Sequence, residues 1–213
     1  MKTVTFYYVR HGRTVYNAEG IIQGQTDSPL WEPGIQVLRD TAEALRDIPF
    51  ARCYSSPLPR AVRTAGIILE DRDVPLEKLD DLKEMSFGRI DGKPHKDHLG
   101  ALRMGHILDS FRFFGGESSW DVKRRAARAF RYMYEHSEDG DHVLVTGHGS
   151  YYRYLVRAVC GKTKVGMKLD RTWTGIANGA VSVIRCTDEK AELVCWPLDA
   201  EGIKKAFTVF TEQ

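Results

Sequence analysis

Short apolar runs, rich in β-branched and aromatic residues, recur along the chain and are separated by polar, turn-rich segments. Three of them are typical of buried strands: residues 4–9, 50–54 and 142–146. Residues 74–79 are a further strand candidate. Residues 180–185 and 191–196 are joined by a polar turn, which predicts a hairpin at the edge of a sheet.

Between these runs, apolar residues recur at three- and four-residue spacing, which is the period of helices. Residues 31–48 are predicted to be helical with Pro33 in the first turn, and the apolar face is expected to hold Val37, Leu38, Ala42 and Leu45. After the strand at 50–54, Ser56 is the expected N-cap of a second helix and Pro57 its first helical residue.

A long helix is predicted to start at Ser118, which forms a capping-box pattern with Asp121. The expected buried stripe of this helix consists of Trp120, Val122, Ala126, Phe130, Met133 and Tyr134. Another helix follows the strand at 142–146 and runs through Tyr154, Leu155, Val156 and Val159.

Polar side chains follow the three buried strands at the point where each strand ends. Arg10 and His11 end the first, Arg60 comes shortly after the second, and His148 follows the third. Because the carboxyl ends of parallel strands line one edge of an open α/β sheet, where ligands bind, we expect these side chains to converge. Neighbours 10 and 11 would point to opposite faces of a strand, so the backbone must leave the extended form there, which Gly12 permits.

Composition narrows the class of protein. The 213 residues suffice for one substantial domain, and the apolar (42%) and charged (28%) fractions are those of an ordinary globular protein. A net charge of +2 gives no general attraction to nucleic acid or membrane, and the short N-terminal apolar run predicts neither a signal peptide nor a membrane span. The cysteines lack C-x-x-C pairing, which predicts reduced thiols in a cytoplasmic protein: Cys53, Cys160, Cys186 and Cys195.

The segment from residue 10 to residue 17 resembles the first signature of the histidine phosphatase superfamily, also called phosphoglycerate mutase-like, through Arg10-His11-Gly12, Thr14 and Asn17. A second motif is similar at Ser56, Leu58, Arg60, Ala61, Thr64 and Ala65. Glu84 matches the superfamily's Leu-x-Glu element, and His148 its second histidine. The resemblance spans nearly the whole chain and implies an α/β fold, a three-layer α/β/α sandwich with a mostly parallel mixed sheet.

The resemblance also implies residue roles. Phosphate would be bound by Arg10, Asn17, Arg60 and His148, and the catalytic residues would be His11, Glu84 and His148. The loop at 20–30 would contact substrate through Gln23, Gly24 and Thr26, with Arg13 as a further candidate. We expect residues 1–213 to form a single domain in which residues 85–118 form a cap over the active site and carry substrate choice.

These residue types suit phosphoryl transfer. A phosphate monoester carries about −1.5 to −2 charges near neutral pH, and arginine binds its oxygens bidentately. Neighbouring cations lower the pKa of an imidazole and would keep His11 neutral and nucleophilic. Fixed donors stabilise the charge of the transferring group, so neither a metal nor another cofactor is required. The predicted activity is a metal-independent phosphatase, a phosphoric monoester hydrolase, that acts on a small metabolite through phosphorylated His11.

Three other functions are weighed against this one. A bisphosphoglycerate-dependent phosphoglycerate mutase would use the same histidine, but Arg13 stands where the family usually has Glu, and Ser150 where mutases have Asn. The insertion after Glu84 is also shorter than mutases carry. A non-catalytic phosphate-binding module of this fold usually lacks the histidine or an arginine. His95 and His98 have a spacing that suits metal ligands, without a carboxylate-rich partner set. The sequence leaves the substrate, the oligomeric state and the role of Glu117 open.

Overall fold

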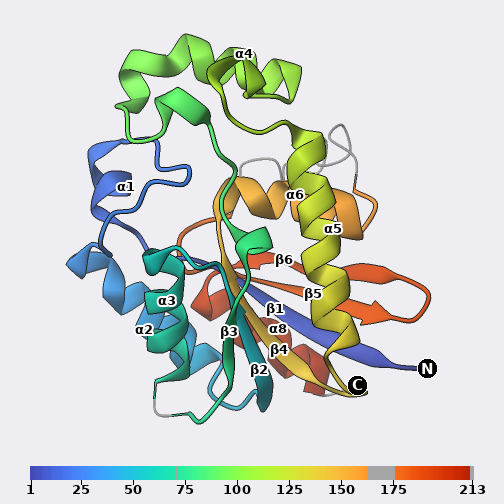
Figure 1. The fold of residues 1–213 in the computed structure, drawn as a ribbon. Helices are drawn as coiled ribbons and strands as arrows, with labels where there is room; N and C mark the ends of the chain where they lie inside the picture. The colour runs from blue at the N-terminus through green and yellow to red at the C-terminus, as the bar shows by residue number, and fades with distance from the viewer. Residues whose placement is uncertain (71, 163–175, 212–213) are drawn as a thin grey trace.

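A six-stranded mixed sheet forms the centre of the molecule (Figure 1). The computed structural model describes residues 1–70, 72–162 and 176–211, of which 208–211 by backbone alone. The strand order is β3-β2-β4-β1-β5-β6. The strands are β1 Thr3–Arg10, β2 Phe50–Ser55, β3 Leu76–Lys78, β4 His142–Gly147, β5 Val181–Thr187 and β6 Ala191–Leu198. The first four strands pair in parallel and the last two antiparallel, so the predicted mostly parallel sheet and the edge hairpin are confirmed.

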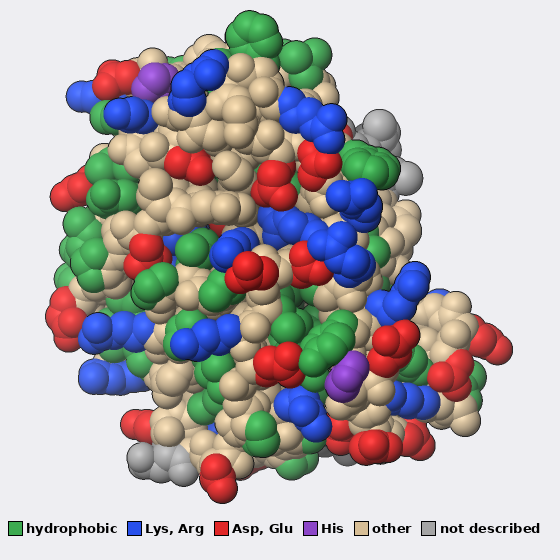
Figure 2. All heavy atoms as spheres, viewed as in Figure 1, with side chains coloured by type: hydrophobic (Ala, Val, Ile, Leu, Met, Phe, Trp, Pro, Cys, Tyr) green, Lys and Arg blue, Asp and Glu red, His purple; other side chains and the backbone are tan. Residues whose placement is uncertain are grey.

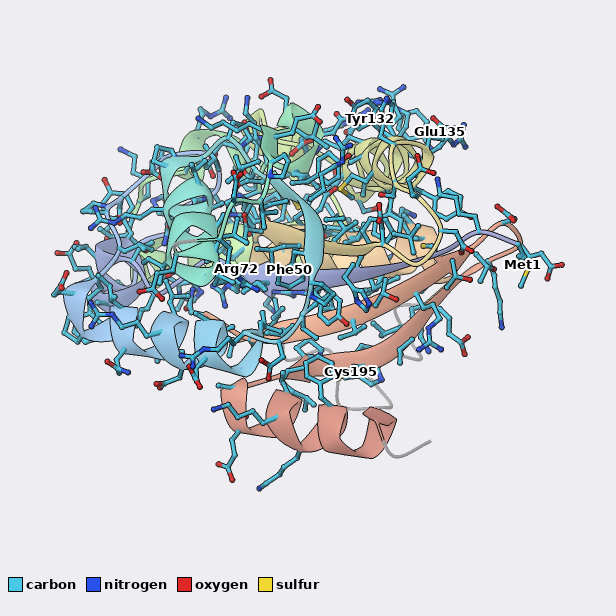
Figure 3. All side chains as sticks on the ribbon, turned by 90° about the horizontal axis from the view of Figure 1, so that it is seen from below. Met1, Phe50, Arg72, Tyr132, Glu135 and Cys195 are labelled. Carbon is cyan, nitrogen blue, oxygen red and sulfur yellow. The ribbon has the colours of Figure 1, made fainter. Side chains whose placement is uncertain are left out.

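Helices cover both faces of this sheet. They are α1 Val15–Glu19, α2 Ile35–Ala44, α3 Pro59–Leu69, α4 Leu99–Leu108, α5 Ser119–Glu135, α6 Gly149–Val159 and α8 Ala200–Thr211. Short 3-10 turns shape the connections: η1 Glu32–Gly34, η2 Asp80–Leu82, η3 Gly88–Ile90, η4 His95–His98 and η5 Arg112–Phe114. Figure 3 shows α5 on one side of the sheet and α8 on the other. Within the described ranges, no helix is both long and apolar enough to cross a bilayer.

The alternation of side chains along β1 divides the core between the two faces. Phe6 and Tyr8 belong to a cluster with α5 and α6, whereas Tyr7 and Val9 belong to a second cluster with α2, α3 and α8. Phe6 packs against Phe130 of α5, with ring centroids 4.5 Å apart. The sheet is therefore covered by helices on both faces, as is usual for parallel strands, and this is the predicted three-layer α/β/α arrangement.

The helix predicted over residues 31–48 starts later and ends earlier. Pro33 lies in η1, and α2 covers only residues 35–44. Leu38 and Leu45 are fully buried as expected, but Val37 is 49% exposed, so its predicted burial is wrong. Val37 is one position from Leu38, a rotation of about 100° around the helix, and the buried face instead runs through Ile35, Leu38 and Thr41.

The start of α3 also differs from the prediction. The helix begins at Pro59, and the N-cap position belongs to Leu58, which makes no side-chain cap. Ser56 is therefore not the N-cap. Its hydroxyl lies 2.7 Å from the ring of His148, 92 residues further along the chain, and this contact cannot be read from local pattern.

The capping box of α5 is confirmed, because the Ser118 and Asp121 side chains each bond the other's backbone N–H. The buried stripe is only partly as predicted. Trp120 is 58% exposed and lies beneath the Arg124 guanidinium, 4.6 Å from the ring centroid. Arg125, which was not part of the predicted stripe, lies on the buried face of the helix.

Residues 85–118 form an irregular segment that carries α4, at the top of the molecule in Figure 1. In the same view, Figure 2 shows basic and acidic side chains interspersed, with apolar side chains gathered at the top. Exposed apolar residues of α4 are Leu99, Met104, Ile107 and Leu108. Phe111 is fully buried in the core cluster shared with α5 and α6, so the segment is tied to the body of the molecule.

Two neighbouring positions on α2 test this packing. Leu38→Ala should lower the free energy of unfolding by about 2–5 kcal/mol, because it leaves a cavity under a fully buried side chain. Val37→Ala should change it by less than about 0.5 kcal/mol, because that side chain is half in solvent. Urea unfolding of both variants measures the difference. Equal losses would contradict the assignment of the buried face.

Candidate active site

Residues from the carboxyl ends of β1, β2 and β4 surround one cavity. Arg10 is the last residue of β1 and Arg60 lies in the first turn of α3. His148 separates β4 from α6 but does not line the cavity, whereas Ser150, two residues further on, does. The cavity has a volume of about 250 Å³, and its polar lining includes Arg10, His11, Asn17, Gln23, Arg60 and Glu84. A larger cavity of about 650 Å³, between α2, α8 and the sheet, contains none of the predicted site residues.

His11 is almost fully buried beside the last residue of β1. Its Nδ1 donates to the carbonyl of Gly12 at 2.8 Å, and this bond leaves Nε2 as the unprotonated nitrogen of the neutral ring. The Gly12 N–H donates to Thr64 Oγ1 at 2.9 Å, which fixes the turn against α3. Burial, and then the charges of Arg60 and Arg10, lower the pKa of His11 well below its ordinary value. His11 is therefore a neutral imidazole with a free lone pair.

Two guanidinium groups flank this imidazole. Arg10 donates through Nη1 to the Ile176 carbonyl at 2.6 Å. Arg60 donates to the Gly24 and Thr26 carbonyls, and it forms an ion pair with Asp27 at 3.0 Å. The Nε–H groups of both arginines are buried and have no acceptor among the residues that the structure describes. They are donors suited to an anion.

Burial lowers the pKa of both guanidinium groups, and the nearby Glu84 carboxylate opposes that shift. Thr26, predicted to touch substrate, contributes its carbonyl to Arg60 and is not part of the cavity lining. The structure therefore places Thr26 behind Arg60, where it orients the guanidinium.

Asn17 and Gln23 lie on the same side of the cavity. The Asn17 Oδ1 accepts from the Thr14 N–H at 3.2 Å in the capping box of α1. It also accepts from Asn178 at 3.4 Å, so the amide oxygen is used inside the protein, and no hydrogen bond of the amide NH₂ is found among the described residues. Gln23 donates to Thr14 Oγ1, and its own Oε1 is buried without a partner in the described part of the chain.

His148 is completely buried next to His11, with ring centroids 5.2 Å apart. Burial, and then Arg60 and the other site charges, lower its pKa well below the ordinary value. Its Nε2 lies 2.7 Å from Ser56 Oγ, while Nδ1 has no hydrogen-bond partner among described residues. The hydrogen-bond network assigns the Ser56 hydroxyl as the donor to Nε2, because the hydroxyl proton has no other acceptor there. The remaining proton of the neutral ring is then on Nδ1.

Glu84 is held at the N-terminus of α6. Its Oε2 accepts from the Ser150 N–H at 3.0 Å, and its Oε1 accepts from the N–H groups of Tyr151 at 2.7 Å and Met85 at 2.8 Å. A helix N-terminus stabilises an anionic group in this way. Within the described part of the chain Oε2 has one donor, against two for Oε1, and it is the oxygen with room for a further hydrogen bond. Ser150 also lines the cavity.

Three contributors were not found from the sequence. Asn178 donates to the His11 carbonyl at 2.8 Å, and its only sequence signal is that it precedes a glycine just before a predicted strand. The Tyr8 hydroxyl accepts from the His148 N–H at 2.6 Å and donates to the His148 carbonyl at 2.9 Å. Ser56 orients the ring of the same histidine. Tyr8 and Ser56 act across the sheet, so neither role has a local signal.

The cap segment and the loop at 20–30 form the other wall of the cavity. Its apolar part consists of Ile22, Phe87 and Leu102, and its polar part includes His95 and His106. His106 packs edge-on against Phe111, with ring centroids 5.5 Å apart. Among the described lining residues, both arginines therefore lie at the strand-end side of the cavity and none on the cap side.

The remaining candidates lie elsewhere. The exposed Arg13 guanidinium stacks 4.5 Å from the Trp31 ring centroid and does not line the cavity. Glu117 forms an ion pair with Arg125 at 2.9 Å. In the part of the chain that the structure describes, no group of three or more His, Cys, Asp or Glu side chains is arranged to hold a metal ion.

Comparison with known proteins agrees with this geometry. Residues 6–199 match the model of the histidine phosphatase superfamily (branch 1). The chain is 34% identical over 161 residues to 2,3-bisphosphoglycerate-dependent phosphoglycerate mutase 2 of Gloeobacter violaceus, covering 70% of this chain and 72% of that protein. It is 42% identical over 91 residues to the adenosylcobalamin/alpha-ribazole phosphatase of Salmonella typhimurium, covering 43% and 45%.

Solved structures of similar proteins share the fold of this chain. A phosphoglycerate mutase from Bacillus anthracis superposes with a TM-score of 0.80 at 26% identity, covering 97% of each chain. YhfR of Bacillus stearothermophilus superposes with a TM-score of 0.78 at 28% identity, covering 90% of this chain and 96% of that one. The fold is thus that of phosphoglycerate mutase-like proteins. This chain belongs to the histidine phosphatase superfamily.

The buried neutral histidines predict how stability depends on pH. Unfolded His11 takes up a proton below its ordinary pKa of 6.5, whereas folded His11 does not, so the free energy of unfolding falls as pH falls below that value. His11→Gln should make this fall shallower by about 1.4 kcal/mol per pH unit. Burial raises the pKa of Asp91 to about 6, so this residue makes the free energy of unfolding rise as pH falls. Its contribution is the same in wild type and His11→Gln and cancels in the difference between their slopes. Urea unfolding between pH 5 and 7 measures both slopes; identical slopes would refute a neutral His11.

The Ser56 contact predicts the tautomer of His148. Nitrogen NMR of the labelled protein should show neutral His148 with its proton on Nδ1, because Ser56 donates to Nε2. Ser56→Ala removes that donor and should raise the population with the proton on Nε2. An unchanged tautomer in Ser56→Ala would show that another group sets it.

Proposed function

We propose that this protein is a phosphatase that hydrolyses phosphate monoesters of small metabolites through a phosphohistidine at His11. The observation that carries this proposal is the neutral His11 ring, with Nδ1 bonded to the Gly12 carbonyl and Nε2 unprotonated, between two buried arginines. A ring of this kind is a nucleophile, and the arginines are ligands for the group it would attack.

Phosphate binding follows from the donors that the protein leaves unused. The Arg10 and Arg60 Nε–H groups, the Asn17 amide and the His148 Nδ1–H can each donate to phosphoryl oxygens. All of these donors are fixed before the ligand arrives, so they stabilise the spread charge of the transferring group without reorganisation. This arrangement supports a reaction that needs no metal ion.

In the first step, the lone pair on His11 Nε2 attacks phosphorus. The bond between phosphorus and the ester oxygen breaks, and its electron pair stays with that oxygen. Glu84 enters this step protonated, although its backbone donors favour the anion, and gives that proton to the same oxygen, so the leaving group departs as an alcohol. Glu84 Oε2, with a single protein donor, is the oxygen we assign to this transfer.

In the second step, water attacks the phosphorus of phosphorylated His11. Glu84 takes a proton from the water, and the bond between Nε2 and phosphorus breaks with its electron pair returning to the ring. The products are inorganic phosphate and the starting form of His11. The bond from Nδ1 to Gly12 holds the same tautomer through both steps.

A phosphoglycerate mutase is the second candidate, favoured by the 34% identity to the Gloeobacter violaceus mutase. Transfer to a second hydroxyl uses the same His11. Against it, the described lining on the cap side consists of apolar side chains and two histidines, without an arginine or lysine for a second anionic group. Conversion of 3-phosphoglycerate with a bisphosphoglycerate primer tests this candidate.

The compartment and partners are part of the same proposal. Four free cysteines suit a reducing cytoplasm, where small phosphorylated metabolites are available. We expect the partner to be such a metabolite, and neither nucleic acid nor membrane.

The experiment compares hydrolysis of p-nitrophenyl phosphate by wild type and His11→Ala, each with and without EDTA. His11→Ala should lose at least roughly 10⁴-fold in kcat, because the nucleophile is gone, and EDTA should change nothing. An acid-labile phosphoryl label should form on wild type alone. His136→Ala, which removes an exposed histidine at the end of α5, is the control and should keep full activity. Turnover by folded His11→Ala would refute the phosphohistidine route, and loss of activity in EDTA would refute metal independence.

A further inference from the structure

Arg125 lies on the buried face of α5 and is only 8% exposed, although a charged residue was not expected there. All five of its N–H donors have acceptors. The Nε–H donates to Glu117 Oε1 at 2.9 Å, and one of the two Nη2–H groups donates to Glu117 Oε2 at 3.0 Å. The other three donate to backbone carbonyls of one turn. A guanidinium in this state is fixed in orientation and has no donor left for a ligand.

The three carbonyls belong to the turn that leads into Glu84. Nη1 donates to the Asp81 carbonyl at 2.9 Å and to the Lys83 carbonyl at 2.5 Å, and Nη2 donates to the Glu84 carbonyl at 3.1 Å. One side chain therefore sets the path of the backbone up to and including Glu84. Lysine has three donors and no planar fork, so it cannot reproduce these contacts.

Glu117 holds the same backbone on the other side of Glu84. Its Oε2 accepts from the Ser86 N–H at 2.8 Å while its two oxygens bind Arg125 bidentately. The pair of Arg125 and Glu117 thus fixes Lys83, the residue before Glu84, and Ser86, two residues after it. Gln25 adds one more bond, from its amide to the Glu84 carbonyl at 3.0 Å.

The pair also contacts the helix that holds the Glu84 carboxylate. The Arg125 guanidinium lies 5.0 Å from the ring centroid of Tyr151, and the Tyr151 N–H donates to Glu84 Oε1. Arg125 therefore touches both the turn that carries Glu84 and the helix end that receives its side chain. Moving the guanidinium would shift the carboxyl relative to His11.

We propose that Arg125 and Glu117 are positioning residues that place the Glu84 carboxyl for proton transfer to the leaving group. The inference rests on the proposed phosphatase function and goes beyond it, because neither residue reaches the cavity. A misplacement of about 1 Å costs roughly 10²-fold in rate, and general acid catalysis contributes about 10²–10⁴-fold. The pair should therefore control most of the benefit that Glu84 provides.

The proposal predicts a dependence on the leaving group. The p-nitrophenolate ion is a weak base and leaves without a proton, whereas the alkoxide of benzyl phosphate is a strong base and needs one. A variant that only weakens the fold or phosphate binding slows both esters alike. A variant that misplaces Glu84 slows benzyl phosphate selectively.

The experiment measures the rate of His11 phosphorylation in a single turnover, from the release of p-nitrophenol or benzyl alcohol. Arg125→Lys should slow benzyl phosphate by about 10²-fold and p-nitrophenyl phosphate by less than about threefold. Glu84→Gln should show the same selectivity. Arg128→Lys is the matched control, because Arg128 lies about one turn further along α5 and, among the described residues, hydrogen bonds the Asp81 side chain and none of the Glu84 turn carbonyls. It should leave both rates within about twofold.

Each result of this experiment either supports or contradicts the positioning role of Arg125 and Glu117. Equal slowing of both esters by folded Arg125→Lys, or no slowing of either, would overturn the positioning role and leave the phosphatase function intact. If Arg125→Lys does not fold, Glu117→Gln gives the same test, with an expected selective loss of about tenfold for benzyl phosphate. If wild type transfers phosphate from neither ester, the proposed function fails and this inference fails with it.

Discussion

Two guanidinium groups and two uncharged imidazoles lie close together at the strand ends, and three of the four side chains, His11, Arg60 and His148, are buried there. The surrounding structure has to accommodate that burial. Arg10 and Arg60 are held by backbone carbonyls and by Asp27, which offset part of the cost of removing a cation from solvent. His11 and His148 avoid that cost by staying neutral. The unused Nε–H donors of Arg10 and Arg60 are what suit the site to phosphate.

The sheet provides the geometry for this arrangement. β1, β4 and β2 are adjacent and parallel, so the residues that follow them meet at one edge although they are up to 138 positions apart in the sequence, from Arg10 to His148. The hydrogen bonds of Tyr8 to the His148 backbone and of Ser56 to the His148 ring then fix the second imidazole from two neighbouring strands. Rigid strands thus position side chains whose separation a loop could not maintain.

Much of the fold could be predicted from the chain itself, because buried parallel strands have a strong compositional signal. The site could be predicted because its residues stand at or shortly after the ends of three such strands: Arg10, His11, Arg60 and His148. The errors have physical causes. Val37 and Trp120 are apolar residues beside the true buried positions, and an amphipathic helix tolerates them on its edge. Arg125 occupies a buried position by its spacing from Val122 and Ala129, but its charge argued for solvent, and only the tertiary contacts with the Glu84 turn explain its burial. Roles that depend on a partner across the sheet, such as that of Ser56, leave no local pattern.

The position of the donors has a consequence for turnover. In the proposed reaction, Arg10, Arg60, Asn17 and His148 contact phosphoryl oxygens, whereas the described cap side offers apolar surface and two histidines to the rest of the substrate. Inorganic phosphate presents the same oxygens as the ester does, so these donors do not distinguish product from substrate. The cap contacts alone favour the ester. The proposed reaction would therefore be inhibited by its own product, and the strength of that inhibition would set how much of the protein is available in a phosphate-rich cell.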